Sequence, residues 1–457
     1  LTTAIAGRLS GVIGYQRSGE PGVDNATFFI RGITTFGTNN SPLILVDNVE
    51  LTVTDLARLQ PDDIESFSIL KDASATALYG ARGANGVVYV TTKQGKAGKA
   101  KINFRIENSV SMPTQNVELA DPITYMKLYN EAQLTRDPLA PIKYSQNQID
   151  NTLNGGNPYI YPATDWRKAL FKRYTQNRRG NLSVSGGGEV AQYYVATSFS
   201  NDNGILKVDK MNNFNNNVKL NNYSVRSNVN INLSNSTQLI VRLYGNFDDY
   251  NGPIDGGSGL YQKALKTSPT SYPAFYAPDK DNETTDHILF GNFDQGQYLN
   301  PYADMVKGYK QYSRSKMLTQ LELTQKLDFW TKGLSVRGLA NINRYSYFDV
   351  TRAYNPYFYR AGSYDKQTDT YKLNWLNQQT GQFFSEPATE YLNYKPGSKD
   401  LETFLYLQGT ADYTRVFNEV HSLNATIVTT LQQSLKNNST ANSQPTLQLS
   451  LPSRNTG

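Results

Sequence analysis

From residue 100 onward, apolar and polar residues alternate along stretches of about 8 to 12 residues, the period of a β-strand with one apolar face. In one stretch Val241 and Leu243 flank Arg242. Equivalent stretches lie at residues 102–110, 192–199, 334–343, 401–412 and 423–431. At ~3.4 Å per residue and a tilt near 45°, ten such residues span roughly 24 Å, the height of the apolar band of an outer-membrane barrel.

The connections between these stretches alternate between short and long. Tight turns are predicted at residues 186–189, 234–236, 328–333 and 418–419, and long loops at 112–179, 201–222, 249–314 and 346–400. Bacterial β-barrels have short periplasmic turns and long extracellular loops, whereas a soluble β-sandwich gives no reason for such regularity. The pattern therefore favours a transmembrane antiparallel β-barrel, with about nine strands in this chain. We expect Val241 to face lipid and Arg242 to face the lumen, where a polar replacement would be mild.

The first hundred residues follow a different pattern, that of a small α/β unit. Short strands are predicted at residues 27–32, 42–48, 65–70 and 87–90, the last of them buried on both faces. Asp47 and Asn48 make a turn after the second strand. Asp72 can cap a helix that ends at Gly80, and Gly83 and Gly86 follow at equal spacing.

These evenly spaced glycines could form a phosphate-binding loop. In a dinucleotide-binding fingerprint, however, the glycines follow a strand and precede a helix, so that the phosphate meets the helix N-terminus. Here they follow the predicted helix and lead into a strand, and no Gly-Lys-Ser/Thr is present. A compact turn between helix and strand is the better interpretation.

The motifs FFIRG, PLILVDNVEL and DDIESFSILKDASATALYGARGANGVVYVTTKQG resemble the plug domain of TonB-dependent outer-membrane transporters. Within them, KDASATALYGARGANGV resembles the signature of the SusC/RagA group, nutrient importers of Bacteroidetes. The resemblance implies an α/β plug domain at residues 1–97 and the N-terminal part of a transmembrane β-barrel at residues 98–457. Barrels of that family close with about 22 strands, so we expect further strands beyond this chain and a signal peptide and TonB-binding box before it. Asn48 departs from the family, which usually has glycine there.

The resemblance also implies function and partners. It predicts active import of an oligosaccharide or oligopeptide across the bacterial outer membrane, energised by TonB–ExbB–ExbD and assisted by a SusD-like surface lipoprotein, with membrane lipid around the barrel. Two alternatives stay open: a siderophore or cobalamin receptor of the same class, or a β-rich glycan-binding surface protein that transports nothing. The net charge of +6 is spread along the chain, without the clustered Lys and Arg expected of a nucleic-acid-binding protein.

Plug motifs supply the first set of candidate site residues: Arg31, Gly32, Asp47, Lys71, Asp72, Gly80, Arg82, Gly83 and Gly86. By resemblance, Arg31 and Arg82 bind carboxylates of the barrel and hold the plug in place. The alternative is that each arginine bonds a plug carboxylate such as Asp47 or Glu65.

Aromatic residues of the long loops supply the second set, as contacts to substrate or partner: Tyr272, Tyr276, Tyr357, Tyr359 and Trp375. Aromatic faces can stack on sugar rings, and tyrosine adds a hydroxyl group. Packing within the loops is the competing interpretation. For Trp330 and Tyr345, predicted to lie near strand ends, an aromatic girdle at the membrane surface is favoured.

Composition adds exclusions. The chain has no cysteine and two histidines, so a thiolate zinc site is impossible, and we predict no metal site and no cofactor. No nucleophile motif is present, so we do not expect an enzyme. Glu322 and Glu402 could be paired acids but are better interpreted as ordinary lumen-facing residues.

Overall fold

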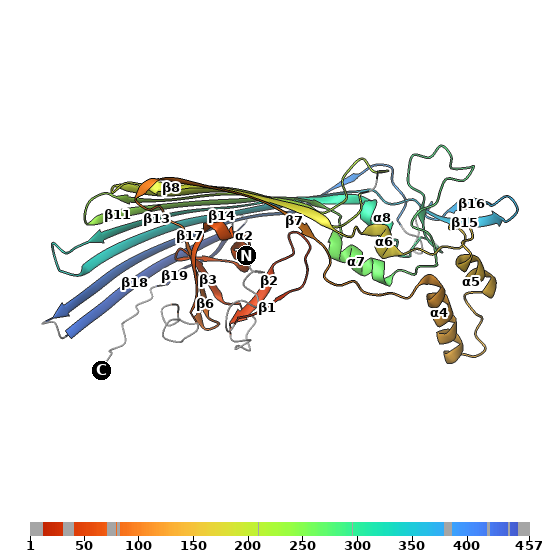
Figure 1. Cartoon of the computed structure of the whole chain (residues 1–457), viewed down its shortest axis with the longest axis horizontal. Helices are drawn as coiled ribbons and strands as arrows, with labels where there is room; N and C mark the ends of the chain where they lie inside the picture. Colours follow the sequence, from red (N-terminus) through yellow and green to blue (C-terminus); the bar gives the residue numbers. More distant parts are fainter. Residues whose placement is uncertain are drawn as a thin grey trace.

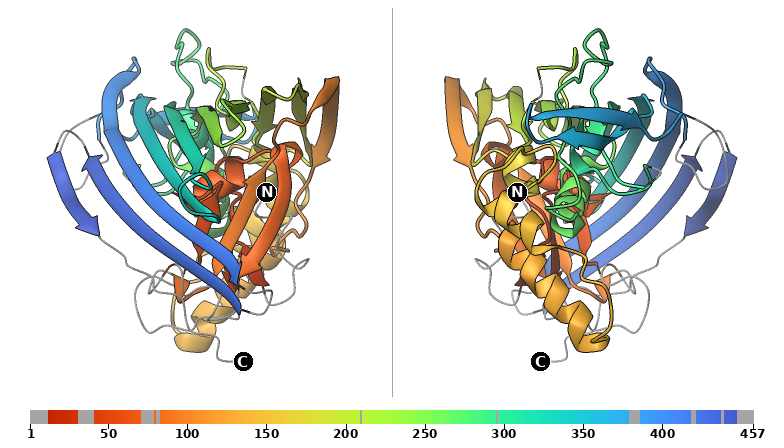
Figure 2. Two further views of the ribbon diagram at one scale, coloured as in Figure 1. Left: turned by 90° about the vertical axis from the view of Figure 1, so that its left-hand side faces the viewer. Right: turned by 90° about the vertical axis from the view of Figure 1, so that its right-hand side faces the viewer.

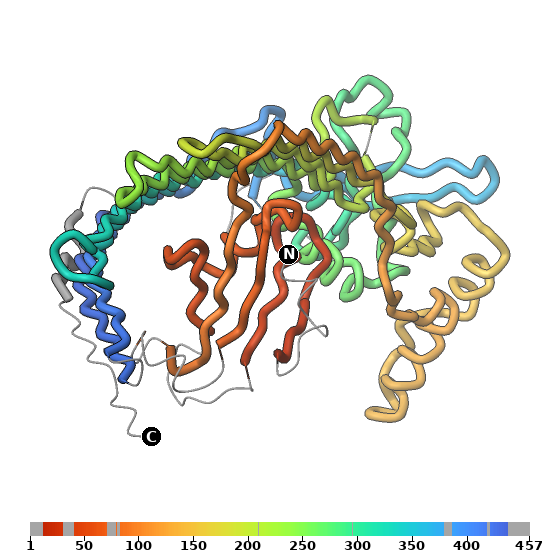
Figure 3. The backbone as a smooth tube through the Cα atoms, turned by 60° about the vertical axis from the view of Figure 1, so that its left-hand side comes forward, coloured from red at the N-terminus to blue at the C-terminus, as the bar shows by residue number. Residues whose placement is uncertain are grey.

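The computed structural model describes residues 12–30, 41–70, 79, 83–208, 210–294, 296–378, 386–417, 421–436 and 439–446. Its largest element is a ten-stranded antiparallel sheet in the order β19-β18-β17-β14-β13-β11-β10-β9-β8-β7. The strands are β7 (Gly98–Ser111), β8 (Thr175–Gly187), β9 (Ala191–Asn203), β10 (Lys219–Asn232), β11 (Thr237–Gly252), β13 (Gly308–Lys326), β14 (Leu334–Ala353), β17 (Asn393–Phe417), β18 (His421–Lys436) and β19 (Ser439–Thr446). The sheet curves as one wall (Figures 1 and 3).

The wall differs from the sequence prediction in strand number and length. It has ten strands rather than about nine, and β13 and β17 run for 19 and 25 residues. The extra length lies at the long-loop ends, where Lys, Ser and Tyr stand in place of aliphatic residues and the apolar alternation fades although the backbone pairing continues. The predicted loops 249–314 and 346–400 are shorter as a result, at 253–307 and 354–392.

The predicted facing of the strands is confirmed. On β11, Leu243 is 45% exposed on the outer face, while Arg242 and Tyr244 are buried on the inner face. On β9, Val195 and Phe199 are exposed and Tyr194 is buried. Neighbouring strands therefore place apolar residues on the same outer face, because residues paired directly across an antiparallel ladder lie on the same face of the sheet.

The plug lies on the concave side of the wall (Figures 2 and 3). It contains a hairpin of β1 (Val12–Gln16) and β2 (Ala26–Ile30) and a four-stranded sheet in the order β4-β3-β6-β5. The sheet consists of β3 (Leu43–Val46), β4 (Val49–Leu51), β5 (Ile64–Leu70) and β6 (Val87–Thr92), and a short helix, α2 (Val53–Arg58), follows β4.

The buried strand and the turn predicted for this region are both confirmed. β6 lies between β3 and β5, and its Val87, Val88 and Val90 are fully buried. Asp47 and Asn48 form the β3–β4 turn with φ of 49° and 71°. The predicted helix from Asp72 to Gly80 falls outside the described residues, apart from Tyr79.

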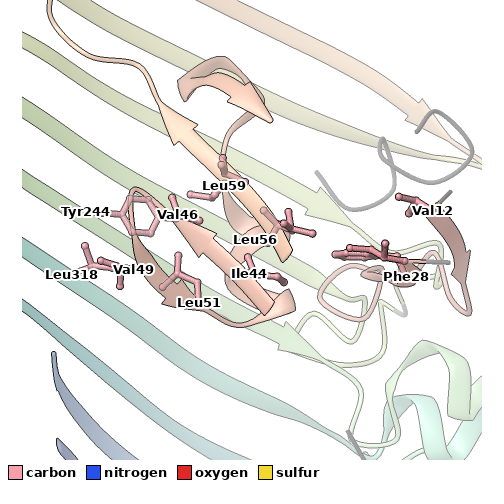
Figure 4. Packing of buried hydrophobic residues seen from close by; sticks show 13 residues of the cluster. Val12, Phe28, Ile44, Val46, Val49, Leu51, Leu56, Leu59, Tyr244 and Leu318 are labelled. Atoms are coloured by element: carbon pink, nitrogen blue, oxygen red, sulfur yellow. The ribbon is translucent and has the colours of Figure 1, made fainter. Parts of the chain in front are cut away.

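Among the described residues, the plug core reaches the wall at Tyr244 and Leu318. Buried side chains of β1, β2, β3, β4, α2 and β6 form one apolar cluster, and all but two of its buried members belong to the plug and the segment after α2. The two from the wall are Tyr244 and Leu318, beside Val46 and Val49 (Figure 4).

The long loops gather at one end of the wall and carry structure of their own (Figure 1). Five helices lie there: α4 (Pro122–Arg136), α5 (Gln146–Leu153), α6 (Trp166–Leu170), α7 (Gly256–Lys266) and α8 (Pro301–Val306). A small sheet of β12 (Phe290–Gly291), β15 (Phe358–Asp365) and β16 (Thr370–Trp375) accompanies them. Within the described ranges, the helices are too short or too polar to cross a membrane.

Candidate functional site at the plug–wall interface

A hydrogen-bonded seam joins the end of β6 to the wall. Thr92 is fully buried, and its amide and hydroxyl groups donate to the Asp47 carboxylate at 2.9 and 2.6 Å. Asn228 of β10 donates to the Thr92 hydroxyl at 2.8 Å and to the Lys93 carbonyl at 2.7 Å. Gln320 of β13 donates to the backbone carbonyl of Asp47 at 3.0 Å. The β3–β4 turn and the end of β6 are thus held by two wall strands.

A buried acid of the plug makes a second contact. Asp63, 2% exposed, accepts a hydrogen bond from the Tyr194 hydroxyl at 2.9 Å and lies 3.4 Å from Nε of Arg226. The Arg226 guanidinium also lies over the Tyr244 ring, 4.5 Å from its centroid. Here the wall supplies the cation and the plug the anion, which is the reverse of the polarity expected from plug arginines.

Helix α2 makes the third contact through its two charged ends. Asp55 pairs with Lys316 of β13, and Arg58 Nε lies 3.5 Å from the carboxylate of Asp248 on β11. Asp248 is fully buried and also contacts Arg314. Each ion pair joins α2 to a wall strand, and Leu56 of the same helix packs in the apolar cluster that includes Tyr244 and Leu318.

A chamber of about 570 Å³, lined by both polar and apolar groups, lies between α2 and the wall beside these ion pairs. Among its lining residues, Tyr244, Asn246 and Asn343 are each more than nine-tenths buried. The Tyr244 hydroxyl, Asn246 Nδ2, Asn343 Oδ1 and Arg58 Nη2 have no hydrogen-bond partner within the described part of the chain. Buried polar groups normally find partners, and a partly polar space of this size has room for water. Separation of the plug from the wall here would expose these polar groups together with apolar ones such as Leu51 and Phe404.

Tyr345 also lines this chamber, which corrects its assignment to a membrane girdle. It shares the inner face of β14 with Asn341 and Asn343, and the strand continues to Ala353 rather than ending near Tyr345. Trp330, in the short turn after β13, is 76% exposed.

The two lumen-facing acids of the sequence analysis have different environments. Glu322 is buried and pairs with Arg242 at 3.0 Å and Arg337 at 3.7 Å, so its partners are cations rather than a second acid. Glu402 lines the chamber. Within the described ranges, no group of three or more His, Asp or Glu residues could hold a metal ion.

The predicted plug-motif residues are described only in part. Arg31, Gly32, Lys71, Asp72, Gly80 and Arg82 lie outside the described residues, so the arginine anchor stays a prediction. Of the alternative partners, Asp47 is bonded by Thr92, and Glu65 pairs with Lys96 at 3.2 Å.

The remaining two plug-motif glycines lie where β6 begins. The Gly86 amide donates to the Gly83 carbonyl at 2.9 Å, and the Gly86 carbonyl accepts from Leu43 at 3.0 Å. Gly86 has φ of +85°, and a Cβ there would lie 2.8 Å from Ile30 of β2. Backbone conformation and close packing thus both require glycine at this position.

The predicted contact aromatics lie mostly inside the loop assembly. Tyr272, Tyr276, Tyr357 and Tyr359 are 2–9% exposed, whereas Trp375 is 38% exposed. Burial raises the pKa of Tyr276 and Tyr359 to about 12. Four of the five therefore pack the loops against one another, which leaves Trp375 as the member of the set that is available for contact.

His287 takes part in the same aromatic cluster. Its ring stacks on Tyr357 with centroids 3.7 Å apart, and Nε2 lies 2.9 Å from the Tyr359 hydroxyl. Burial lowers the pKa of His287 below 6.5, against the opposing effect of Glu390 and Asp286.

The residue pairs that join the plug to the wall were not identified from the sequence. Asp63 and Tyr194 are 131 residues apart, and Asp47 and Gln320 are 273 apart. The alternation along each strand does place four of the wall residues on the inner face: Tyr194, Arg226, Asp248 and Gln320. It shows that they face the plug but does not identify their partners.

Comparison with known proteins supports this architecture. The TonB-dependent Receptor Plug Domain model matches residues 1–87. A TonB-dependent receptor of Formosa agariphila is 34% identical over 216 residues, 47% of this chain and 19% of the relative. TonB-dependent receptor SusC of Bacteroides thetaiotaomicron is 30% identical over 224 residues, 47% of this chain and 20% of SusC. The matched parts thus amount to about a fifth of these curated relatives.

A solved structure shares the fold over nearly the whole chain. The RagAB peptide importer in its open-open state gives a TM-score of 0.67 at 19% identity, covering 99% of this chain and 49% of that chain. Residues 1–87 thus match the plug domain of TonB-dependent receptors, and the plug on the concave face of an antiparallel barrel wall is the fold of such receptors. The chain is similar in sequence to receptors of the SusC type and shares its fold with the RagAB importer.

Proposed function

We propose that the protein imports a large nutrient, an oligosaccharide or an oligopeptide, across the outer membrane with energy from TonB–ExbB–ExbD. A SusD-like surface lipoprotein delivers the cargo at the loop end of the wall. Residues 1–97 form the plug, and residues 98–457 form the wall with its loops. No chemical step on the cargo is part of this proposal.

The observation that supports import most directly is the polar attachment of the plug. Ion pairs at Asp55, Arg58 and Asp63, and hydrogen bonds at Asp47 and Thr92, hold it to the wall. When plug and wall separate, both members of an ion pair recover their hydration, whereas exposure of apolar area costs about 25 cal/mol per Å². A plug attached in this way is suited to repeated release and reseating, which a permanent seal would not need.

Uptake in the native bacterium tests the proposal. Cells lacking the gene, cells lacking TonB and complemented cells would be given labelled oligosaccharides, labelled peptides, a ferric siderophore and cobalamin. We expect one oligomer class to accumulate only when both the receptor and TonB are present. Accumulation of the siderophore or cobalamin instead, or surface binding without TonB-dependent uptake, would support one of the alternative functions.

Trp375 is the residue of the aromatic set that we propose for contact with cargo or lipoprotein. Its indole N–H donates to Asn377 at 3.0 Å, and its ring lies 5.4 Å from that of Tyr357. The buried tyrosines act by holding this platform in place.

A further inference from the structure

The turn between β1 and β2 of the plug touches a helix of the outer loops. Glu20 in this turn accepts a hydrogen bond from the amide of Gly257 at 2.7 Å through Oε1. Its Oε2 accepts from the amide and the hydroxyl of Ser258, both at 2.8 Å. Ser18 Oγ lies 3.3 Å from Ser258 Oγ. The acceptor and the donors are more than 230 residues apart in the chain.

These contacts supply the N-terminal cap that α7 does not provide for itself. The residue at the capping position, Asp255, makes no side-chain hydrogen bond to the helix amides. Its carboxylate instead accepts from Lys263 at 2.8 Å. The first amides of a helix have no intrahelical partner and favour a negative charge nearby, so Glu20 satisfies both requirements from outside the loop.

Two glycines make room for the incoming carboxylate. Gly256 has φ of +67°, and a Cβ there would lie 3.2 Å from Glu20 Oε1. A Cβ on Gly257 would lie 3.3 Å from the Glu20 Cδ atom. The start of α7 is therefore shaped to receive the side chain of Glu20.

The capped helix connects onward to the rest of the loop assembly. Leu260 and Ala264 of α7 are buried in the cluster that also contains α6 and α8. Lys263 contacts Asp304 of α8 at 2.5 Å. A change at the start of α7 can thus reach its neighbours through contacts that the structure shows.

We infer that Glu20 is a removable cap on α7, which couples the position of the plug's β1–β2 turn to the order of the loop at residues 253–307. When the turn is in place, the first turn of α7 is satisfied, and when the turn withdraws, that helix end loses its acceptors. The use of this coupling during import rests on the proposed function, but the coupling itself is a property of the folded chain.

Hydrogen exchange on the full-length protein in detergent tests the cap directly. Glu20→Gln keeps the shape of the side chain but replaces one acceptor oxygen with a donor. We expect amides in the first turn of α7 to exchange roughly 5- to 30-fold faster, the change that corresponds to a lost helix cap. Glu65→Gln is the matched control, because Glu65 is a plug carboxylate paired at the surface with Lys96. Equal exchange of α7 in Glu20→Gln and wild type would overturn the inference.

A substitution in α7 tests whether a change in the helix also affects the plug turn. Ser258→Ala removes one of the three bonds to Glu20 and places a better helix former in α7. Because coupling free energies are reciprocal, we expect the plug turn at residues 17–25 to exchange about 2- to 5-fold faster. An unchanged plug turn would overturn the coupling. Neither measurement involves transport, so a failed uptake experiment and a failed cap are distinguishable.

Discussion

At the scale of single residues, the inner face of the wall holds charges in an environment that resembles a protein interior. Arg242 and Glu322 are both buried, and their side-chain atoms meet at 3.0 Å. The sequence correctly predicted that Arg242 faces inward, but not its acidic partner. A buried ion pair contributes little by itself, whereas loss of one partner leaves the other charge uncompensated. The expectation that a polar replacement of Arg242 is mild therefore changes.

We predict that Arg242→Gln lowers the free energy of unfolding by about 3 kcal/mol, the lower end of the range for a broken buried pair. The lower end applies because Arg337 remains 3.7 Å from the Glu322 carboxylate. The measurement is the urea midpoint of the full-length protein refolded in detergent. Lys96→Gln is the control: its ion pair with Glu65 is exposed, and its loss should change stability by less than about 1 kcal/mol. Equal effects of the two substitutions would show that Arg242 is not acting as a buried partner.

A second prediction at this scale concerns the β3–β4 turn. Asn48 has φ of 71°, and its side chain accepts a hydrogen bond from the Tyr89 hydroxyl at 2.8 Å. Asn48→Gly and Asn48→Ala both remove that bond, but only alanine adds the cost of a left-handed conformation. We expect Asn48→Ala to be less stable than Asn48→Gly by about 1 kcal/mol. Hydrogen exchange of β3 and β4 measures the difference, and a more stable alanine variant would contradict the turn geometry.

At the scale of elements, sequence periodicity predicted what depends on local pattern. The strand facing around Val241, the buried strand at Val87–Val90 and the turn at Asp47 could all be predicted, because side-chain alternation and turn preference act over a few residues. The candidate site residues inside the plug motifs were predicted from the same short-range patterns and from the resemblance to the transporter family. The length of β13 and β17 could not be predicted, because backbone pairing continues where the apolar alternation stops.

The loop helices were also missed, although their starts carry recognisable signals. Asp121 precedes Pro122 and accepts from the amides of Ile123 and Thr124. Asn300 precedes Pro301 and caps α8 in the same way. A capping residue followed by proline is typical of a helix start and should have been used within the long loops. The plug–wall partners are different: no local signal pairs Asp63 with Arg226, because only the closed fold brings them together.

The loop cluster around His287 gives a prediction on pH. Because its pKa is lowered in the folded protein from an ordinary value of 6.5, the unfolded loop binds more protons near and below that value. Stability of the cluster should therefore be complete above about pH 6.5 and decline as pH falls through 6.5 toward the lowered pKa. We expect residues 358–375 to exchange faster near pH 5 than near pH 8, after correction for intrinsic rates. His287→Gln should remove most of this pH dependence, and an equal dependence in that variant would assign it to another group.

At the scale of the whole molecule, the plug is held by apolar packing and by polar contacts to the wall. Its apolar core is largely internal and reaches the wall through Tyr244 and Leu318, while ion pairs and hydrogen bonds make the other contacts described above. The plug can therefore keep its own fold while its attachment changes. The β1–β2 turn adds a connection to the outer loops, so the plug touches both the wall and the loop assembly.

This arrangement leads to the last prediction, that the plug must move for cargo to pass. Thr92→Cys with Asn228→Cys replaces a plug–wall hydrogen bond of 2.8 Å with a pair that can be crosslinked. The chain has no cysteine, so no other thiol within it competes, and any cysteine elsewhere in the complete protein would be removed. We expect crosslinking to abolish TonB-dependent uptake, reduction to restore it, and binding of cargo at the cell surface to persist in both states.

A crosslink within the wall provides the control that separates plug movement from general damage. Ser198→Cys with Ser224→Cys joins the neighbouring strands β9 and β10, where the two hydroxyl oxygens lie 2.5 Å apart. Both serines are buried on the inner face, as Thr92 and Asn228 are at the plug–wall contact. Disulfide formation therefore takes place at a buried site in both variants. The disulfide between β9 and β10, however, does not attach the plug to the wall. Uptake should survive it. If the plug–wall crosslink forms completely and uptake equals that of the wall-only pair, cargo passes without displacement of the plug at β6, and the moving-plug mechanism is wrong for this protein.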